Sequence, residues 1–214
     1  MGIVKKGPAK GWSGKVGNYV YSQHADRETT VSEAPTPSVL PATAKQSSAR
    51  QVTTICGRYL SPLKGFVKVG AQAKGSPKGQ SPYNIMVSYA RAHAIKGVYP
   101  NQYIDFSKLL ITQGTMTPPG DAIVQLTEEG LAFEWNPDNI QDEDHYTDQV
   151  MIVAYFPELK TARYKTSCAE RYVGKYLLPL AGIKKGYTAE IYISFITDDR
   201  DRISDSVYLG QLIW

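Results

Sequence analysis

The chain has 214 residues, of which 42% are hydrophobic, with a formal net charge of +4 and two cysteines. This composition provides enough apolar surface for one sizeable core or two small ones, so it excludes a disordered chain and a disulfide scaffold. No stretch reaches the roughly 18 apolar residues of a membrane span, and the basic start lacks the apolar run of a secretory signal. We therefore expect a cytoplasmically made protein with no membrane partner.

Residues 1–50 have the composition of an extended basic arm. They contain five Gly and four Pro among many Ser, Thr and Lys residues, which predicts flexibility unless the arm is docked. An alternating apolar patch after the Gly-rich turn at Ser13 indicates a short strand, which could add to the sheet edge of a neighbour. Aromatic anchors are typical of interfaces, so we expect the partner contact at four residues: Trp12, Lys15, Tyr19 and Tyr21.

Residues 51–102 are expected to form two short helices around a basic, Gly-rich loop. The first helix, over residues 45–64, is predicted from helical spacing of apolar residues: Val52, Ile55, Cys56, Tyr59, Leu60 and Leu63. The second begins at Ser81-Pro82, an N-cap followed by proline, and stops at Gly97. The loop between them, Lys68 to Gln80, provides three further candidate contact residues: Lys68, Lys74 and Lys78.

From Tyr103 onward the apolar period changes to two, which indicates strands. The expected strands are residues 104–112, 122–126, 131–135, 149–155, 161–166, 172–178, 189–196 and 207–213. Seven or eight short strands with a Trp near the third predict an immunoglobulin-like antiparallel β-sandwich over residues 103–214. The cysteine pair of antibody domains is absent, which leaves the strand topology open. The predicted class is mainly β: this sandwich, preceded by the extended arm and two short helices.

Three stretches of sequence are distinctive. They are GWSGKVGNYVYS at residues 11–22, SYARAHAIKGVYPNQYIDFSKLLITQGTM at residues 88–116, and GYTAEIYISFITDDRDRISDSVYLGQL at residues 186–212. Together they resemble the small proteins of Bacteroidota and their phages grouped as domain of unknown function 6266. The resemblance implies a Bacteroidota or phage origin and a β-rich C-terminal domain. The family has no established activity, so the resemblance implies no catalytic residues.

No pattern in the chain indicates an enzyme. Gly14-Lys15 lacks the earlier Gly and the following Ser or Thr of a phosphate-binding loop, because Ala9 and Val16 occupy those positions. The three histidines lie in separate segments, and the acidic clusters at residues 142–148 and 198–205 lack the Gly turn of a calcium loop. No Gly-x-Ser-x-Gly motif is present. We therefore expect no catalytic residue, metal or cofactor.

Charge is divided unevenly along the chain. Residues 1–110 hold 15 Lys and Arg against 4 Asp and Glu, whereas residues 111–214 hold 9 against 16. This asymmetry predicts a basic surface that binds an acidic partner, namely nucleic acid, another protein or the acidic half of a neighbouring copy.

Three functions fit these features. The first is a non-enzymatic structural component of a phage virion, such as a capsid-decorating, collar or tail-ring subunit, whose partners are other copies and other virion proteins. The second is a nucleic-acid-associated protein that uses the arm and the Lys68–Lys78 loop. The third is an immunoglobulin-like adhesion module. Steep loss of binding with salt would distinguish the second from the first.

Overall fold

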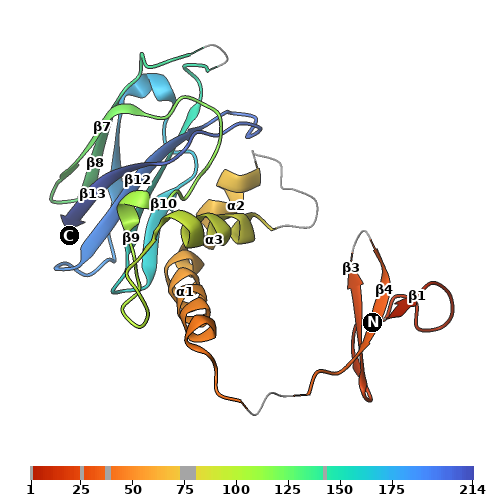
Figure 1. Ribbon diagram of the computed structural model, residues 1–214. Helices are drawn as coiled ribbons and strands as arrows, with labels where there is room; N and C mark the ends of the chain where they lie inside the picture. The colour runs from red at the N-terminus through yellow and green to blue at the C-terminus, as the bar shows by residue number, and fades with distance from the viewer. Residues whose placement is uncertain (1, 25–26, 37–39, 73–80, 142–143) are drawn as a thin grey trace. The chain divides into compact units, whose positions relative to one another are not determined.

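The computed structural model describes residues 2–24, 27–36, 40–72, 81–141 and 144–214, and is mainly β as predicted (Figure 1). The chain divides into two compact units, Met1–Thr43 and Ala44–Trp214. This division differs from the expected boundaries after residues 50 and 102. The helices belong to the same unit as the sandwich, for reasons of packing given below.

The N-terminal unit is a small folded sheet. Its strands are β1 (Gly2–Val4), β2 (Gly14–Val16), β3 (Tyr19–His24) and β4 (Arg27–Glu33), in the antiparallel order β1-β4-β3-β2. The structure therefore replaces the expected extended arm with a sheet through residue 33. The reason lies in the glycines, which occupy tight turns: Gly17, with φ 59°, closes the two-residue connection between β2 and β3.

The second unit contains the predicted sandwich, with seven strands among its described residues where seven or eight were expected. One sheet has the order β11-β8-β7 and the other β10-β9-β12-β13, all antiparallel. β10, the fourth strand of the sandwich in sequence, pairs with the third strand, β9. In constant-type immunoglobulin domains the fourth strand instead belongs to the sheet that contains the first, second and fifth strands. The strands are β7 (Gly120–Leu126), β8 (Gly130–Asn136), β9 (Gln149–Phe156), β10 (Thr161–Lys165), β11 (Lys175–Pro179), β12 (Thr188–Ile196) and β13 (Val207–Ile213).

The strand expected over residues 104–112 is not formed. Instead, β5 (Ile95–Lys96) pairs with β6 (Tyr103–Ile104), and a 3-10 turn, η2 (Phe106–Lys108), follows. The Asp105 carboxylate starts this turn by accepting hydrogen bonds from the Ser107 amide (3.1 Å) and hydroxyl (2.6 Å). A second 3-10 turn, η3 (Arg171–Val173), occupies the start of the strand expected at residues 172–178.

The described residues before the sandwich form three α-helices, where two were predicted. They are α1 (Ala44–Leu60), α2 (Lys64–Gln72) and α3 (Pro82–His93), with the 3-10 turn η1 (Ser61–Leu63) between the first two. The Ser81 cap is confirmed, since its hydroxyl accepts the Asn84 amide (3.2 Å). Helix α2 covers part of the segment that was expected to be a loop. The chain stays helical past Pro62 because this proline lies in the first turn of η1, where its missing N–H costs nothing.

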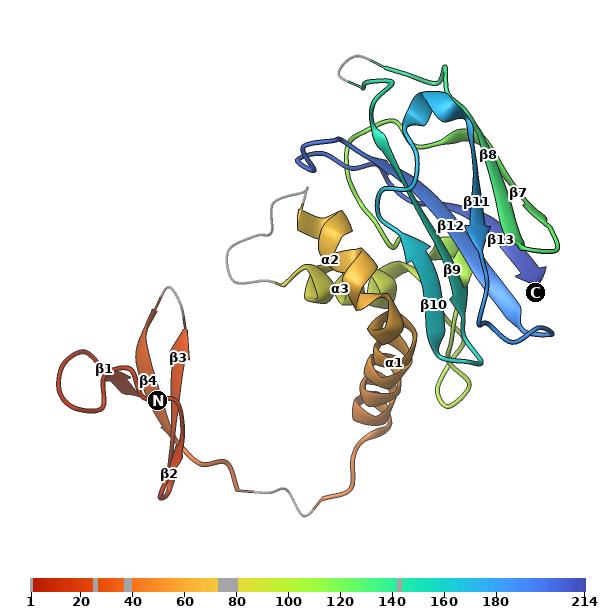
Figure 2. The same cartoon turned by 180° about the vertical axis from the view of Figure 1, so that it is seen from behind.

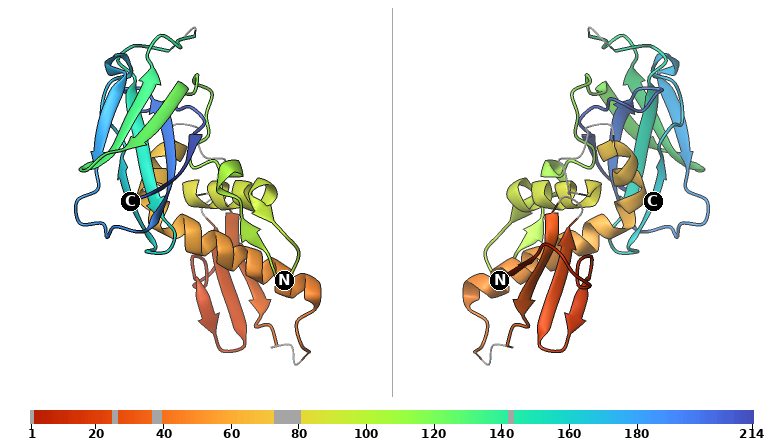
Figure 3. Two further views of the ribbon diagram at one scale, coloured as in Figure 1. Left: turned by 90° about the vertical axis from the view of Figure 1, so that its left-hand side faces the viewer. Right: turned by 90° about the vertical axis from the view of Figure 1, so that its right-hand side faces the viewer.

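The helices share an apolar core with one sheet of the sandwich, and a second core lies between the two sheets. Alternate residues of β9 point to opposite sides of its sheet: Met151, Val153 and Tyr155 pack with the helices, and the residues between them pack with the second sheet. A strand buried on both faces reads as the continuous apolar run seen in β9. The helical layer thus covers the side of sheet β10-β9-β12-β13 opposite to β7, β8 and β11 (Figures 1, 2 and 3).

Candidate functional site

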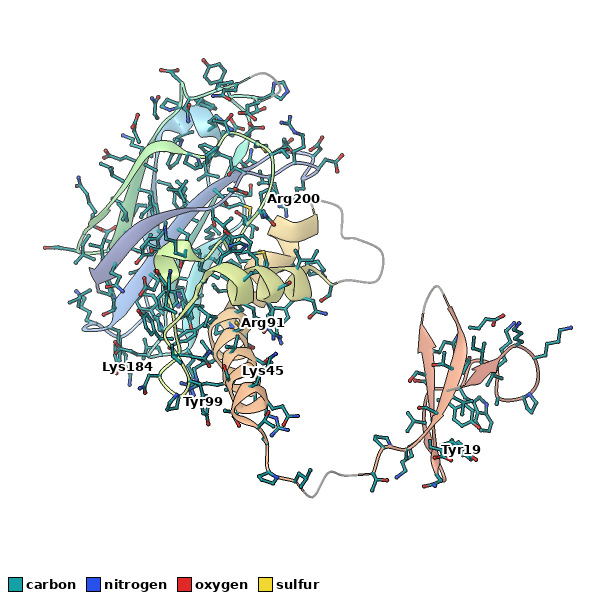
Figure 4. All side chains as sticks on the ribbon, viewed as in Figure 1. Tyr19, Lys45, Arg91, Tyr99, Lys184 and Arg200 are labelled. Atoms are coloured by element: carbon teal, nitrogen blue, oxygen red, sulfur yellow. The ribbon has the colours of Figure 1, made fainter. Side chains whose placement is uncertain are left out.

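One face of the N-terminal sheet gathers apolar and aromatic side chains. Tyr19 pairs with Val16 on β2 and Tyr21 with Val31 on β4, and residues directly opposite each other in a sheet share a face. The Trp12 ring lies edge-on to the Tyr21 ring, with 5.6 Å between centroids. We call these five residues the aromatic face; Figure 4 marks Tyr19 on its sheet.

Three residues of the aromatic face are exposed to solvent, and Tyr21 and Val31 are half-buried. Tyr19 and Val16 are each 49% exposed and Trp12 is 44% exposed. Both apolar core clusters consist of residues from Cys56 onward, and Thr29 is the sole buried residue among those described in Met1–Thr43. Its hydroxyl accepts the Gly11 amide at 2.8 Å. A sheet ordinarily buries one face against another layer, and the described residues of this unit supply no such layer.

The structure brings three of the four expected arm residues together and separates the fourth. Trp12, Tyr19 and Tyr21 are neighbours, whereas Lys15 pairs with Val20 and therefore lies on the opposite face. Strand β2 is an edge strand whose partner within the described residues is β3 alone. Its outer edge presents backbone groups available for strand addition.

The expected lysine loop is placed only in part. Lys68 is an exposed residue of α2 and lines a hollow of about 420 Å³, together with Lys64, Ser81, Pro82 and Tyr83. The Lys64 ammonium lies 5.1 Å from the centre of the Tyr83 ring. Lys74 and Lys78 lie outside the described residues.

The groups considered for catalysis do not converge. The His93 ring stacks on Tyr89 at the end of α3, and His145 lines a hollow of about 490 Å³ near Asp198. Within the described ranges, no three His, Cys, Asp or Glu side chains are grouped as a metal ion requires. Both cysteines are free thiols, and burial raises the pKa of the Cys168 thiol to about 12, which keeps it protonated and unreactive.

The sequence did not predict the buried ion pair between Arg171 and Asp148. Arg171 has no exposed surface; its guanidinium donates to Asp148 Oδ2 (3.1 Å) and to the Asn139 carbonyl (3.0 Å), and lies 3.9 Å from the centre of the Phe195 ring. Asp144 is 3.8 Å away. No spacing rule indicates this pair, because the partners are 23 residues apart and meet only when the loops close over the end of the sandwich.

A buried carboxylate likewise joins β12 to β13. Glu190 accepts hydrogen bonds from the Tyr208 hydroxyl (2.6 Å) and the Gln211 amide (2.7 Å). Burial raises the pKa of Glu190 above its usual value, although both hydrogen bonds act in the opposite direction. This carboxylate links strands within the core and is not part of an open site.

Comparison with known proteins gives a family and a likeness to a solved structure. The model of a family of unknown function, DUF6266, matches residues 11–210. None of the curated proteins matches the chain. A solution structure of the fn3 domain of the human collagen alpha-1(XX) chain is similar over 46% of this chain and 84% of that one, with 14% identity and a TM-score of 0.34. No helix of the described residues is long and apolar enough to cross a membrane.

Proposed function

This chain belongs to the DUF6266 family, and we propose that it is a non-enzymatic structural subunit of a large assembly, docked through its N-terminal sheet. The observation that carries this proposal is the aromatic face. The described residues of the N-terminal unit belong to neither apolar core cluster, and its four-stranded sheet leaves Trp12 and Tyr19 nearly half exposed, so covering that face with another protein would stabilise the unit.

The composition of the aromatic face suits protein binding. Trp and Tyr bury large areas while losing few rotamers, and truncating such anchors at the centre of an interface costs about 2 kcal/mol or more. The Trp12 ring already packs against Tyr21, so less side-chain entropy is lost when the face binds a partner. The exposed edge of β2 adds backbone hydrogen-bonding groups beside these anchors.

The assembly that we propose is a phage virion, in which this chain is a capsid-decorating, collar or tail-ring subunit. Support comes from the resemblance of its motifs to proteins of Bacteroidota phages and from the docking surface described above. Uneven charge along the chain also suits contacts between copies in a ring.

Mass spectrometry of density-purified particles from the source culture tests this setting. We expect the chain in particles at a fixed ratio to the major capsid protein, corresponding to about five or six copies or a multiple of these in a ring. A chain found in the soluble cell fraction and absent from particles would contradict the virion role. Docking is tested separately by Tyr19→Ser, which is expected to release the chain from its partner.

Nucleic-acid binding is the second candidate. The excess of 15 Lys and Arg over 4 Asp and Glu in residues 1–110 favours it. Binding of an oligonucleotide that falls steeply between low and moderate salt would support it, because phosphate contacts release counterions. The adhesion hypothesis rests on the sandwich alone, and a sandwich hosts many unrelated functions.

A further inference from the structure

The helical segment of the second unit has no carboxylates. Residues 34–104 contain nine Lys and Arg and no Asp or Glu, whereas residues 105–214 contain ten Lys and Arg against 17 Asp and Glu. Seven of the nine cations are described: Lys45, Arg50, Arg58, Lys64, Lys68, Arg91 and Lys96. The ion pairs found between described residues involve none of these seven and lie in the sandwich. Apart from Lys96, which interacts electrostatically with Asp105, these surface cations of the helical layer have no acidic partner among the described residues.

Two open hollows meet at Arg91 on this surface. One, of about 500 Å³, is lined mainly by α1: Ala49, Arg50, Thr53, Thr54 and Arg91. The other, of about 410 Å³, is lined by α3: Asn84, Val87, Ser88, Arg91 and Ala92. We call the joined hollows the Arg91 groove, and Figure 4 shows Arg91 beside α1.

The groove offers guanidinium groups as its main hydrogen-bond donors. The Thr53 and Thr54 hydroxyls donate to helix carbonyls four residues back, at 2.9 and 3.0 Å, so they have no proton left for a ligand. Arg50 and Arg91, on facing helices, remain as the charged donors, with the Asn84 side-chain amide and the Ser88 hydroxyl beside them. Two guanidinium forks suit a ligand with carboxylates, which they bind in bidentate fashion.

A rigid acidic turn lies elsewhere in the same chain. The connection between β12 and β13 exposes three carboxylates within four residues, Asp198, Asp199 and Asp201. Asp199 Oδ1 accepts from the Thr197 hydroxyl (2.6 Å) and the Asp201 amide (3.0 Å), and the Arg202 amide donates to the Thr197 hydroxyl (3.1 Å). The turn is thereby fixed before binding, which lowers the entropy cost of docking.

Within one copy neither surface is fully compensated: the groove has no ion pair among the described residues, and in the turn Arg200 and Arg202 offset part of the charge of the three carboxylates. The hollow beside the acidic turn and the two hollows of the Arg91 groove share no residue. No ion pair joins the two surfaces within the part of the chain that the structure describes. Figure 4 likewise places Arg200, in the turn, away from Arg91 and beyond α2.

We propose that the Arg91 groove binds the acidic turn of a second copy of this chain, so that copies associate head to tail. Such a contact is heterologous, and it closes into a ring if the rotation between copies permits. It uses the second unit alone and is independent of docking through the N-terminal sheet. The hydrogen-bonded turn is also held ionised, since its bonds from Thr197 and Asp201 lower the pKa of Asp199.

The composition of the groove favours carboxylates over nucleic acid. No aromatic side chain lines either hollow, so there is no surface on which bases stack. Two guanidinium groups also fall short of the roughly 6–10 phosphate contacts that give strong electrostatic binding to nucleic acid. The excess of acidic residues in the sandwich would repel a long polyanion.

Sedimentation velocity on the full chain tests this inference by charge exchange. At about 50 mM salt we expect the weight-average mass to rise with concentration, and Arg91→Glu to weaken this association at least about tenfold. The double variant Asp198→Lys/Asp201→Lys is expected to lose association as well. A mixture of the two variants should regain it, because each copy then meets a surface of opposite charge. Lys184→Glu, on the sandwich, is the matched control and should associate like the wild type.

Three results would overturn the inference. The first is a wild-type chain that stays monomeric to high micromolar concentration. The second is Arg91→Glu sedimenting like the wild type, which would assign any association to another surface, such as the N-terminal sheet. The third is unchanged self-association with loss of single-stranded oligonucleotide binding in Arg91→Glu, which would assign the groove to phosphates.

Discussion

Replacing Arg171 with Met is the sharpest test of how the sandwich end is held together. The guanidinium has no exposed surface, and the Asp144 and Asp148 side chains are 1% and 2% exposed. Met fills much of the same space but leaves Asp148 buried without its cation, Asp144 with only the partly exposed Arg202 nearby, and the Asn139 carbonyl without its donor. Breaking a buried pair in this way costs about 3–5 kcal/mol, because the remaining charge is uncompensated.

Urea unfolding followed by tryptophan fluorescence measures this loss, provided that the denaturant slope is unchanged. Arg202→Met is the matched control: its guanidinium lies 3.9 Å from Asp144 but is 31% exposed, so we expect a loss of about 1 kcal/mol or less. The double variant Arg171→Met/Asp148→Asn should recover part of the stability by removing one orphaned charge. A loss below about 1 kcal/mol for Arg171→Met, equal to that of the control, would refute the reasoning.

Three further predictions follow from the described contacts. Tyr19→Ser should leave the unfolding of the second unit unchanged while weakening partner binding by about 2 kcal/mol or more, measured by co-sedimentation with the assembly; equal binding would contradict the docking role. Glu190→Gln should be more stable than the wild type at neutral pH, because the pKa of Glu190 is raised in the folded protein. Protonation of Glu190 stabilises the wild type below the pKa of this group in the unfolded chain, and that contribution is lost as pH rises through the pKa in the folded protein. Thermal unfolding at several pH values should therefore show the stability difference between the variant and the wild type closing in acid. Tyr155→Phe should leave the free energy of unfolding unchanged, because the buried hydroxyl has no partner among the described residues. Tyr192→Phe should lower it by about 1 kcal/mol, because it removes the 2.9 Å hydrogen bond to the Phe106 carbonyl. Similar losses of stability for the two variants in urea unfolding would contradict this difference.

Local features of the sequence determined the elements that need no distant partner. The Ser81-Pro82 cap and the period-two segments from β7 onward correspond to the observed α3 and to most strands of the sandwich, because capping and alternation depend on residues close in sequence. The shared face of Tyr19 and Tyr21 was also predictable, since both belong to one alternating segment, whereas Trp12 precedes the Gly-rich turn and meets Tyr21 only in the fold.

Tertiary structure decided the features that depend on distant contacts. The apolar pattern of β9 does not show which layer covers each face of the strand. In the structure the helices cover one of these two faces. The register of β2 placed Lys15 opposite the aromatic face, and the closing loops brought Arg171 to Asp148. Glycines of the first 50 residues suggested flexibility, but several of them, such as Gly17, occupy turns of a sheet. Composition shows that a glycine can adopt many conformations, and the pairing of distant strands selects one of them.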